Sequence, residues 1–209
     1  MPDRARDVRE FWFGRVPLDA ARLAERMDFW FGANEPPAVR RERDDAMRER
    51  FEPLVADAAR GKLAAWAVSP RRSLALVLLL DQLPRNLYRG TPRAFATDRQ
   101  ALALTLAGIQ SGADAALAAA ERIFFYMPLQ HSESAEAQDE SVAAYRRLLD
   151  ESAEALRPQL SVTLESAERH RSIIERFGRF PHRNRILGRP TTPEEEAFLA
   201  AGADSFGQD

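Results

Sequence analysis

The sequence predicts an all-α protein built as one domain. Apolar residues recur at helical spacing through nearly all of the 209 residues. The longest uninterrupted apolar run, residues 74–80, is mainly leucine rather than β-branched residues, which favours a buried helix over a strand. No linker rich in glycine and serine divides the chain. We therefore expect about eight or nine antiparallel packed helices in a single domain over residues 1–202, followed by a loose tail over residues 203–209.

Three helices are predicted before the apolar run. Each is indicated by apolar residues three or four apart: Val8, Phe11 and Trp12 in the first, Leu23, Met27 and Trp30 in the second, and Met47, Phe51 and Leu54 in the third. Pro36 and Pro37 are typical of a helix start, and Gly61 of a helix end. Pro53 is expected to kink the third helix without ending it.

A buried central helix is predicted next. Ser69 and Pro70 match an N-cap and a first helical position, and residues 74–80 are apolar on every side. Pro84 is expected to break this helix, because proline lacks the N–H that continues the hydrogen-bond pattern.

Five further helices are predicted in the second half of the chain. The segments Thr97–Gln100 and Thr192–Glu195 have the spacing of a capping box and open two of them. Pro128 is expected to end one helix, and Ser132 to cap the next. The pair Arg157-Pro158 marks the joint between two others.

Composition narrows the classes of function. The chain has no cysteine, and its formal net charge of −2 does not favour binding to nucleic acid. No apolar run is long enough to cross a membrane, and the first residues lack the apolar stretch of a signal peptide, so we expect a cytoplasmic protein. Among the 30 basic residues only Lys62 is a lysine, so a single arginine is weak support for an anion site.

Two similar phrases stand out from the helical background. Residues 83–92 read LPRNLYRGTP, and residues 180–193 read FPHRNRILGRPTTP. Each passes from an apolar residue and a proline through Arg-Asn to a glycine and Thr-Pro. The recurrence records two related halves of the chain, or it is a coincidence among common loop residues; both interpretations stay open.

The first phrase follows a cluster of polar candidates. Asp81, Gln82, Arg85 and Asn86 are expected to converge at a helix end. Asp81 and Arg85 are four residues apart and can form an ion pair. Arg85 and Asn86 can donate hydrogen bonds to a carboxylate or phosphate. The alternative is that the ion pair only ties the helix end to the loop.

A second cluster follows the aromatic run at residues 124–126, which we expect to be part of the core. Gln130, His131 and Glu133 come directly after this run. His131 is a candidate general base, oriented by Glu133 or by another carboxylate. Ser132 is not expected to be a nucleophile, because no G-x-S-x-G motif is present.

The second phrase supplies the remaining candidates. His182 lies in a predicted loop beside Arg183 and Asn184, and Arg179 precedes them, so a ligand-binding role is favoured. His170 lies on an apolar stripe and is expected to face the core. The three histidines of the chain lack the spacing of a metal-binding helix motif, and no phosphate-binding glycine loop occurs, so we predict neither a metal nor a cofactor.

Together these segments resemble the uncharacterised bacterial family DUF924. The resemblance is carried by FWFG at residues 11–14, LLLDQLPRNLYRGTPRAFATD at 78–98, ERIFFYMPLQHSE at 121–133 and RHRSIIERFGRFPHRNRILGRPTTPEEEAFL at 169–199. Leu83 departs from the family pattern, where phenylalanine is expected. The resemblance implies an all-helical, TPR-like fold, but no established activity or catalytic residues. TPR-like folds usually present a concave groove for peptides.

Three hypotheses about function follow. In the first, the protein is a helical scaffold whose two Arg-Asn pairs clamp a small anionic ligand or a peptide. In the second, it is a small hydrolase or transferase with His131 or His182 as general base, Glu133 as its orienting group, and Arg85 or Arg183 as the electrophilic stabiliser. In the third, the motifs are structural ties in a protein-interaction module. The oligomeric state is open, and a homodimer is one expectation.

Overall fold

Helices supply the regular secondary structure of the computed structural model, which describes residues 3–31, 36–202 and 206. The α-helices are α1 Arg4–Phe13, α2 Ala20–Phe31, α3 Pro37–Ala59, α4 Pro70–Val77, α5 Leu83–Leu87, α6 Asp98–Gln110, α7 Ala119–Gln130, α8 Ala135–Glu151, α9 Arg157–Phe177, α10 Asn184–Leu187 and α11 Pro193–Ala200. No strand occurs in these described ranges, and the predicted all-α class is confirmed. Apart from Phe206, the predicted tail at 203–209 lies outside the described residues.

Most buried apolar residues form a core around α4, and a smaller cluster lies at the end of α9, around Ile173, Ile174 and Phe180. Residues 74–80 have between 0 and 4 % of their surface exposed, so the predicted central helix is confirmed. It packs against α1, α6 and α7. Trp12, Trp30 and Phe124 make edge-to-face contacts beside it, which join α1, α2 and α7. The aromatic run at 124–126 is therefore core, as expected.

The central helix does not end at Pro84, so that prediction is wrong. A π-turn at Leu78–Gln82 joins α4 directly to α5, and the N–H of Leu83 donates to the carbonyl of Leu78. Pro84 has no N–H to offer the carbonyl of Leu80 four residues earlier. The hydroxyl of Thr97 donates to that carbonyl instead, at 2.5 Å. Because its hydroxyl is used in this way, Thr97 makes no capping box, although α6 does begin after it.

The predicted end of α7 is also wrong. The helix continues through Pro128 to Gln130. The side-chain amide of Gln138 donates to the carbonyls of Gln130 and Ser132, and more weakly to that of Leu129, which also accepts from the N–H of Ser132. Ser134, not Ser132, caps α8 by accepting a hydrogen bond from the N–H of Ala137.

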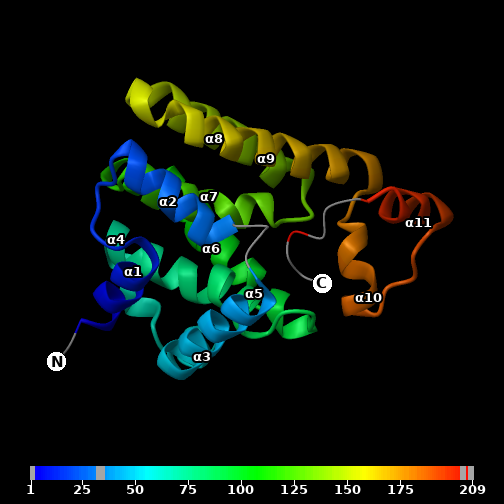
Figure 1. Ribbon diagram of the computed structural model, residues 1–209, viewed down its shortest axis with the longest axis horizontal. Helices are drawn as coiled ribbons and strands as arrows, with labels where there is room; N and C mark the ends of the chain where they lie inside the picture. The colour runs from blue at the N-terminus through cyan, green and yellow to red at the C-terminus, as the bar shows by residue number, and fades with distance from the viewer. Residues whose placement is uncertain (1–2, 32–35, 203–205, 207–209) are drawn as a thin grey trace.

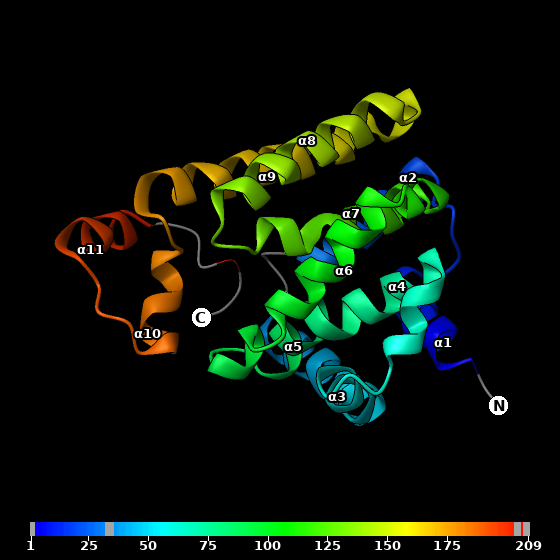
Figure 2. The ribbon, with the colours of Figure 1, turned by 180° about the vertical axis from the view of Figure 1, so that it is seen from behind.

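The outer layer is formed by consecutive helices. Figures 1 and 2 show α8 and α9 side by side along one edge of the molecule, with α7 beneath them. The chain then turns at Gly178, whose φ of 67° lies in the left-handed region. It forms the short turn η6 (Pro181–Arg183) before α10 and α11. The capping box predicted at Thr192 and Glu195 is present at the start of α11.

The contact between α6 and α7 supports a stability prediction. A methyl group added at Gly108 would lie 2.8 Å from Cε1 of Phe125, a ring that is 1 % exposed. We expect Gly108→Ala to lower the free energy of unfolding by about 1–2 kcal/mol, because the overpacking cost of roughly 1–3 kcal/mol exceeds the better helix propensity of alanine.

Urea denaturation measures this effect, and Gly108→Ala combined with Phe125→Leu should recover much of the loss. Ala107 is exposed on the same helix, and Ala107→Gly serves as the control that changes helix propensity alone. A Gly108→Ala protein that is more stable than wild type would contradict the close approach of the two helices.

Candidate functional site

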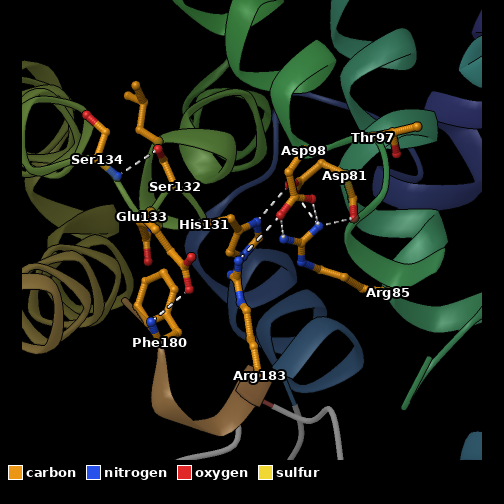
Figure 3. Close-up of polar contacts among 12 residues, drawn as sticks. Asp81, Arg85, Thr97, Asp98, His131, Ser132, Glu133, Ser134, Phe180 and Arg183 are labelled. Atoms are coloured by element: carbon orange, nitrogen blue, oxygen red, sulfur yellow. Dashed lines mark hydrogen bonds and ion pairs between the residues drawn. The ribbon is translucent and has the colours of Figure 1, made fainter. Parts of the chain in front are cut away.

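A carboxylate and an imidazole meet where the π-turn faces the end of α7. Oδ1 of Asp81 lies 2.7 Å from Nδ1 of His131 (Figure 3). The side chain of Asp81 is fully buried, whereas that of His131 keeps 16 % of its surface exposed. We call these two residues the dyad. Because π-turns inside α-helices often occur at functional positions, the placement of Asp81 supports a functional role.

Both oxygens of Asp81 are held by further donors. Nη1 of Arg85 lies 3.1 Å from Oδ1, and Nε2 of Gln82 lies 2.6 Å from Oδ2. The predicted ion pair between Asp81 and Arg85 is therefore present. Arg85 also forms two hydrogen bonds of 2.9 Å with the carboxylate of Asp98, at the start of α6. The carboxylate of the dyad is consequently fixed in position by two neighbouring side chains.

The charge states of the dyad follow from this packing. Burial by itself raises the pKa of Asp81, but the charge of Arg85 and the hydrogen bonds to the carboxylate outweigh it, and the pKa lies well below its usual range. Burial, together with repulsion from Arg85, lowers the pKa of His131 despite the attraction of Asp81. We infer a neutral imidazole at pH 7. Its Nδ1 carries the proton donated to Asp81, which leaves a lone pair on Nε2.

Arg183 is a buried cation beside the dyad. Its side chain extends from η6 toward His131 and Asp98 (Figure 3). Nη1 lies 3.5 Å from Oδ2 of Asp98, and the guanidinium packs 4.7 Å from the ring of Phe95 and 4.5 Å from that of Phe180. Burial is the main cause that lowers the pKa of Arg183 to about 10, and repulsion from the charge of Arg85 is the second. Nε is buried and has no hydrogen-bond partner among the described residues.

The other two histidines lie in the same region. The rings of His131 and His170 are 6.3 Å apart, and Phe206 contacts His170 at 4.1 Å and His182 at 5.2 Å. Nδ1 of His170 lies 2.7 Å from the carbonyl of Ser166, and the residue is buried as expected. Burial is the main reason that the pKa values of His170 and His182 fall to about 3. Within the described residues, no group of three or more histidine and carboxylate side chains is arranged to hold a metal ion.

Glu133 belongs to a different set of contacts. Arg189 donates to both of its oxygens, at 2.8 and 3.0 Å, and the N–H of Phe180 donates at 2.8 Å. Burial alone raises the pKa of Glu133, but these donors outweigh it and the pKa is lowered. Glu133 therefore anchors the chain after α9 rather than orienting His131. Asp81 is the carboxylate that contacts the imidazole.

The neighbouring candidates anchor the same segment. Arg179 donates to both oxygens of Glu195, at 2.6 and 2.8 Å, and this bonding is the main cause that lowers the pKa of Glu195 to about 2. Asn184 donates to Glu195 and accepts from Arg189. These contacts tie the turn that carries Arg183 to α11, which is a structural role for Arg179 and Asn184.

The structure thus brings together only part of the predicted set. Asp81, His131, Arg85 and Arg183 share one site, and Gln82 supports it. Asn86 instead bonds the carbonyl of Gln82 and the guanidinium of Arg89. Asp98, which bridges the two arginines, was not among the predicted site residues. No periodicity links Asp98 to Arg85, because an intervening turn, Pro92–Phe95, separates α5 from α6.

Comparison with known proteins agrees with this architecture. The family model "Bacterial protein of unknown function (DUF924)" matches residues 8–203. The chain belongs to the DUF924 family. A solved structure of a protein of unknown function from Agrobacterium tumefaciens is similar to this DUF924 protein, with 38 % identity and a TM-score of 0.77 over 95 % of this chain and 98 % of the other. No curated protein matches the sequence. Among the described residues of this DUF924 chain, no helix is long and apolar enough to cross a membrane.

Proposed function

We propose that this DUF924 protein is a small enzyme of hydrolase or transferase type that acts on an anionic small molecule. His131 is the general base and Arg183 binds the anionic group of the substrate. The observation that carries the proposal is the 2.7 Å contact between Nδ1 of His131 and the buried carboxylate of Asp81. A carboxylate behind a neutral imidazole fixes its tautomer and stabilises the imidazolium that forms when Nε2 accepts a proton.

The charges around the dyad support the choice of substrate class. Arg85 is bound by Asp81 and Asp98, and its charge keeps Asp81 ionised. Within the part of the chain that the structure describes, the ion pair of Arg183 is the longer contact with Asp98, and its Nε has no hydrogen-bond partner. A carboxylate or phosphate beside Arg183 would receive charge-assisted hydrogen bonds in a region of low dielectric. His131 would then lie next to the atom that loses its proton.

The test uses two chromogenic esters, the anionic mono-4-nitrophenyl succinate and the neutral 4-nitrophenyl acetate. We expect turnover of the anionic ester to fall at least about 100-fold in His131→Gln, which is the usual contribution of a general base. Arg183→Met should raise KM for the anionic ester and leave the neutral ester unchanged. Asn86→Ala is the matched control, since Asn86 lies outside the site. Equal turnover by wild type and His131→Gln would refute the enzymatic role.

The runner-up is a scaffold that binds an anionic ligand or peptide without chemistry. The unpaired Nε of Arg183 favours binding in either case. Saturable binding of succinate without turnover of any ester, lost in Arg183→Met, would support the scaffold. A TPR-like groove, a cytoplasmic location and a homodimer stay predictions. Size-exclusion chromatography with light scattering would test the last of these.

A further inference from the structure

A second basic region is formed by arginines of α1 and of the start of α4, two helices that pack against each other (Figure 1). Two adjoining hollows, of about 300 and about 430 Å³, share a wall made by Arg6, Arg9 and Arg71. Arg72 also lines the smaller hollow, and Arg15 lines the larger. We call these two spaces the basic hollow. Each lies within or close to the size range of small-molecule sites, roughly 300–1,000 Å³.

The arginines outnumber the carboxylates that could neutralise them. Only Asp3 and Glu10 are acidic among the lining residues. Asp3 lies 3.5 Å from Arg72, and Glu10 lies 2.7 Å from Arg6. These contacts are exposed and therefore weak.

Of the other three arginines, one is paired within the described residues and two are not. Arg9 uses its Nε and Nη2 on the buried carboxylate of Glu121, which holds the guanidinium in place. Arg15 and Arg71 are exposed and make no ion pair with the described residues. The hollow therefore has an unneutralised positive charge on a protein whose overall charge is −2.

The start of α4 adds to this field. Pro70 is the first residue of the helix, and the Ser69 side chain makes no capping hydrogen bond to the first turn. The N-terminus of a helix carries a partial positive charge and favours phosphate groups. Arg71 and Arg72 belong to the first turn of α4, so their charges add to the partial positive charge of the helix N-terminus. Phe13 and Val16 give the larger hollow a partly apolar wall.

We propose that the basic hollow binds a small organic phosphate. The phosphate contacts Arg71 and the shared arginine wall, and the carbon body of the ligand lies against the side of Phe13 and Val16. Arginine suits this role because its planar fork can donate two hydrogen bonds to one phosphate. This site is separate from the dyad, and it does not depend on the enzymatic role of His131.

The test is an NMR-monitored titration of the full-length protein with phenyl phosphate, with inorganic phosphate and with phenol. We expect saturable shifts of α1 and α4 amides with phenyl phosphate, weaker binding of inorganic phosphate and none of phenol. The double variant Arg15→Ala/Arg71→Ala should weaken the binding of phenyl phosphate at least 10-fold. Arg147→Ala is the control, because Arg147 is an exposed arginine paired with Glu140 elsewhere on the surface.

Arg183→Met distinguishes this site from the dyad: the affinity measured from the shifts of α1 and α4 amides should stay unchanged, even if phenyl phosphate also binds beside Arg183 in wild type. The proposal is overturned if phenyl phosphate gives no saturable shift at millimolar concentration, if the double variant binds as wild type does, or if Arg183→Met abolishes binding. It is also overturned if Arg147→Ala weakens binding as much as the double variant, since that would indicate attraction to arginines in general.

Discussion

Replacing Arg85 by methionine is expected to lower the free energy of unfolding at pH 7 by about 3–5 kcal/mol, the range for removing one partner of a buried ion pair. Asp81 has no exposed surface, and the side chain of Arg85 keeps only 10 %. Without the guanidinium, Asp81 loses its main counter-charge, and Asp98 keeps only the 3.5 Å contact with Arg183. Urea denaturation followed by circular dichroism measures the loss.

The pH dependence of Arg85→Met separates lost charge from lost packing. In wild type the pKa of Asp81 is lower than in the unfolded chain, where it is near 4. The ionised carboxylate therefore stabilises the folded protein above about pH 4, and this stabilisation is lost as the pH falls further. In Arg85→Met the carboxyl can protonate at a higher pH, so the difference from wild type should shrink between pH 7 and pH 4. Arg147→Met, at an exposed ion pair, should cost less than about 1 kcal/mol. A loss of similar size in both variants would contradict the buried network.

Wild-type stability is expected to fall steeply below pH 6.5. The pKa values of His170 and His182 are lowered to about 3, so both remain neutral in the folded protein while the unfolded chain takes up two protons. The pKa of a histidine in the unfolded chain is about 6.5. Because the pKa is lower in the folded protein, the full stabilisation is present above this pH and is lost as the pH decreases. At about 1.4 kcal/mol per proton and pH unit, the two residues give a slope of up to about 3 kcal/mol per pH unit.

Denaturation curves between pH 4.5 and pH 7.5 measure that slope. The variants His170→Asn and His182→Asn should each reduce it by up to about 1.4 kcal/mol per pH unit, whatever they do to stability at pH 7.5. The window lies above the range in which most carboxylates titrate. A stability that is flat between pH 6.5 and 5, or a slope that neither variant changes, would show that these imidazoles are not buried as neutral groups.

The helices and the core could be predicted from the sequence because periodicity depends on neighbours along the chain. The apolar run at 74–80 predicted a fully buried segment, its leucine content favoured helix over strand, and it is a buried helix. The interruptions were harder to predict. Pro84 does not end its helix, because Thr97, which is distant in sequence, donates to the carbonyl that the proline leaves free. Ser134 rather than Ser132 caps α8. The side-chain amide of Gln138 fixes the preceding loop by donating to the carbonyl of Ser132.

The candidate site was predictable in composition but not in pairing. Asp81 and Arg85 are four apart on a helix, so their ion pair follows from local geometry. The carboxylate nearest to His131 in sequence is Glu133, yet Asp81, fifty residues away, is the one in contact. Asp98 gives no local signal because its partners come from a preceding helix and from η6. Partner choice between distant segments is set by tertiary packing, which one sequence does not encode locally.

The two Arg-Asn phrases also differ in what they do. Arg85 is bound by the carboxylates of Asp81 and Asp98, whereas Arg183 packs between two aromatic rings and its Nε has no hydrogen-bond partner among the described residues. Asn86 bonds the carbonyl of Gln82 and the guanidinium of Arg89, and Asn184 ties the turn to α11. The two similar sequence segments therefore do not form two equivalent clamps. Arg85 sets the charge of the dyad, and Arg183 is the cation that we propose binds an anion.

The most direct test of the dyad is the tautomer of His131, measured by ¹⁵N NMR of histidine-labelled protein. The chain has three histidines, so single substitutions assign every signal. We predict a neutral ring at pH 7.5 with the proton on Nδ1 and a deprotonated Nε2, and a loss of this preference in Asp81→Asn. A ring that is protonated on both nitrogens at pH 7.5, or one that carries its proton on Nε2 alone, would contradict the account.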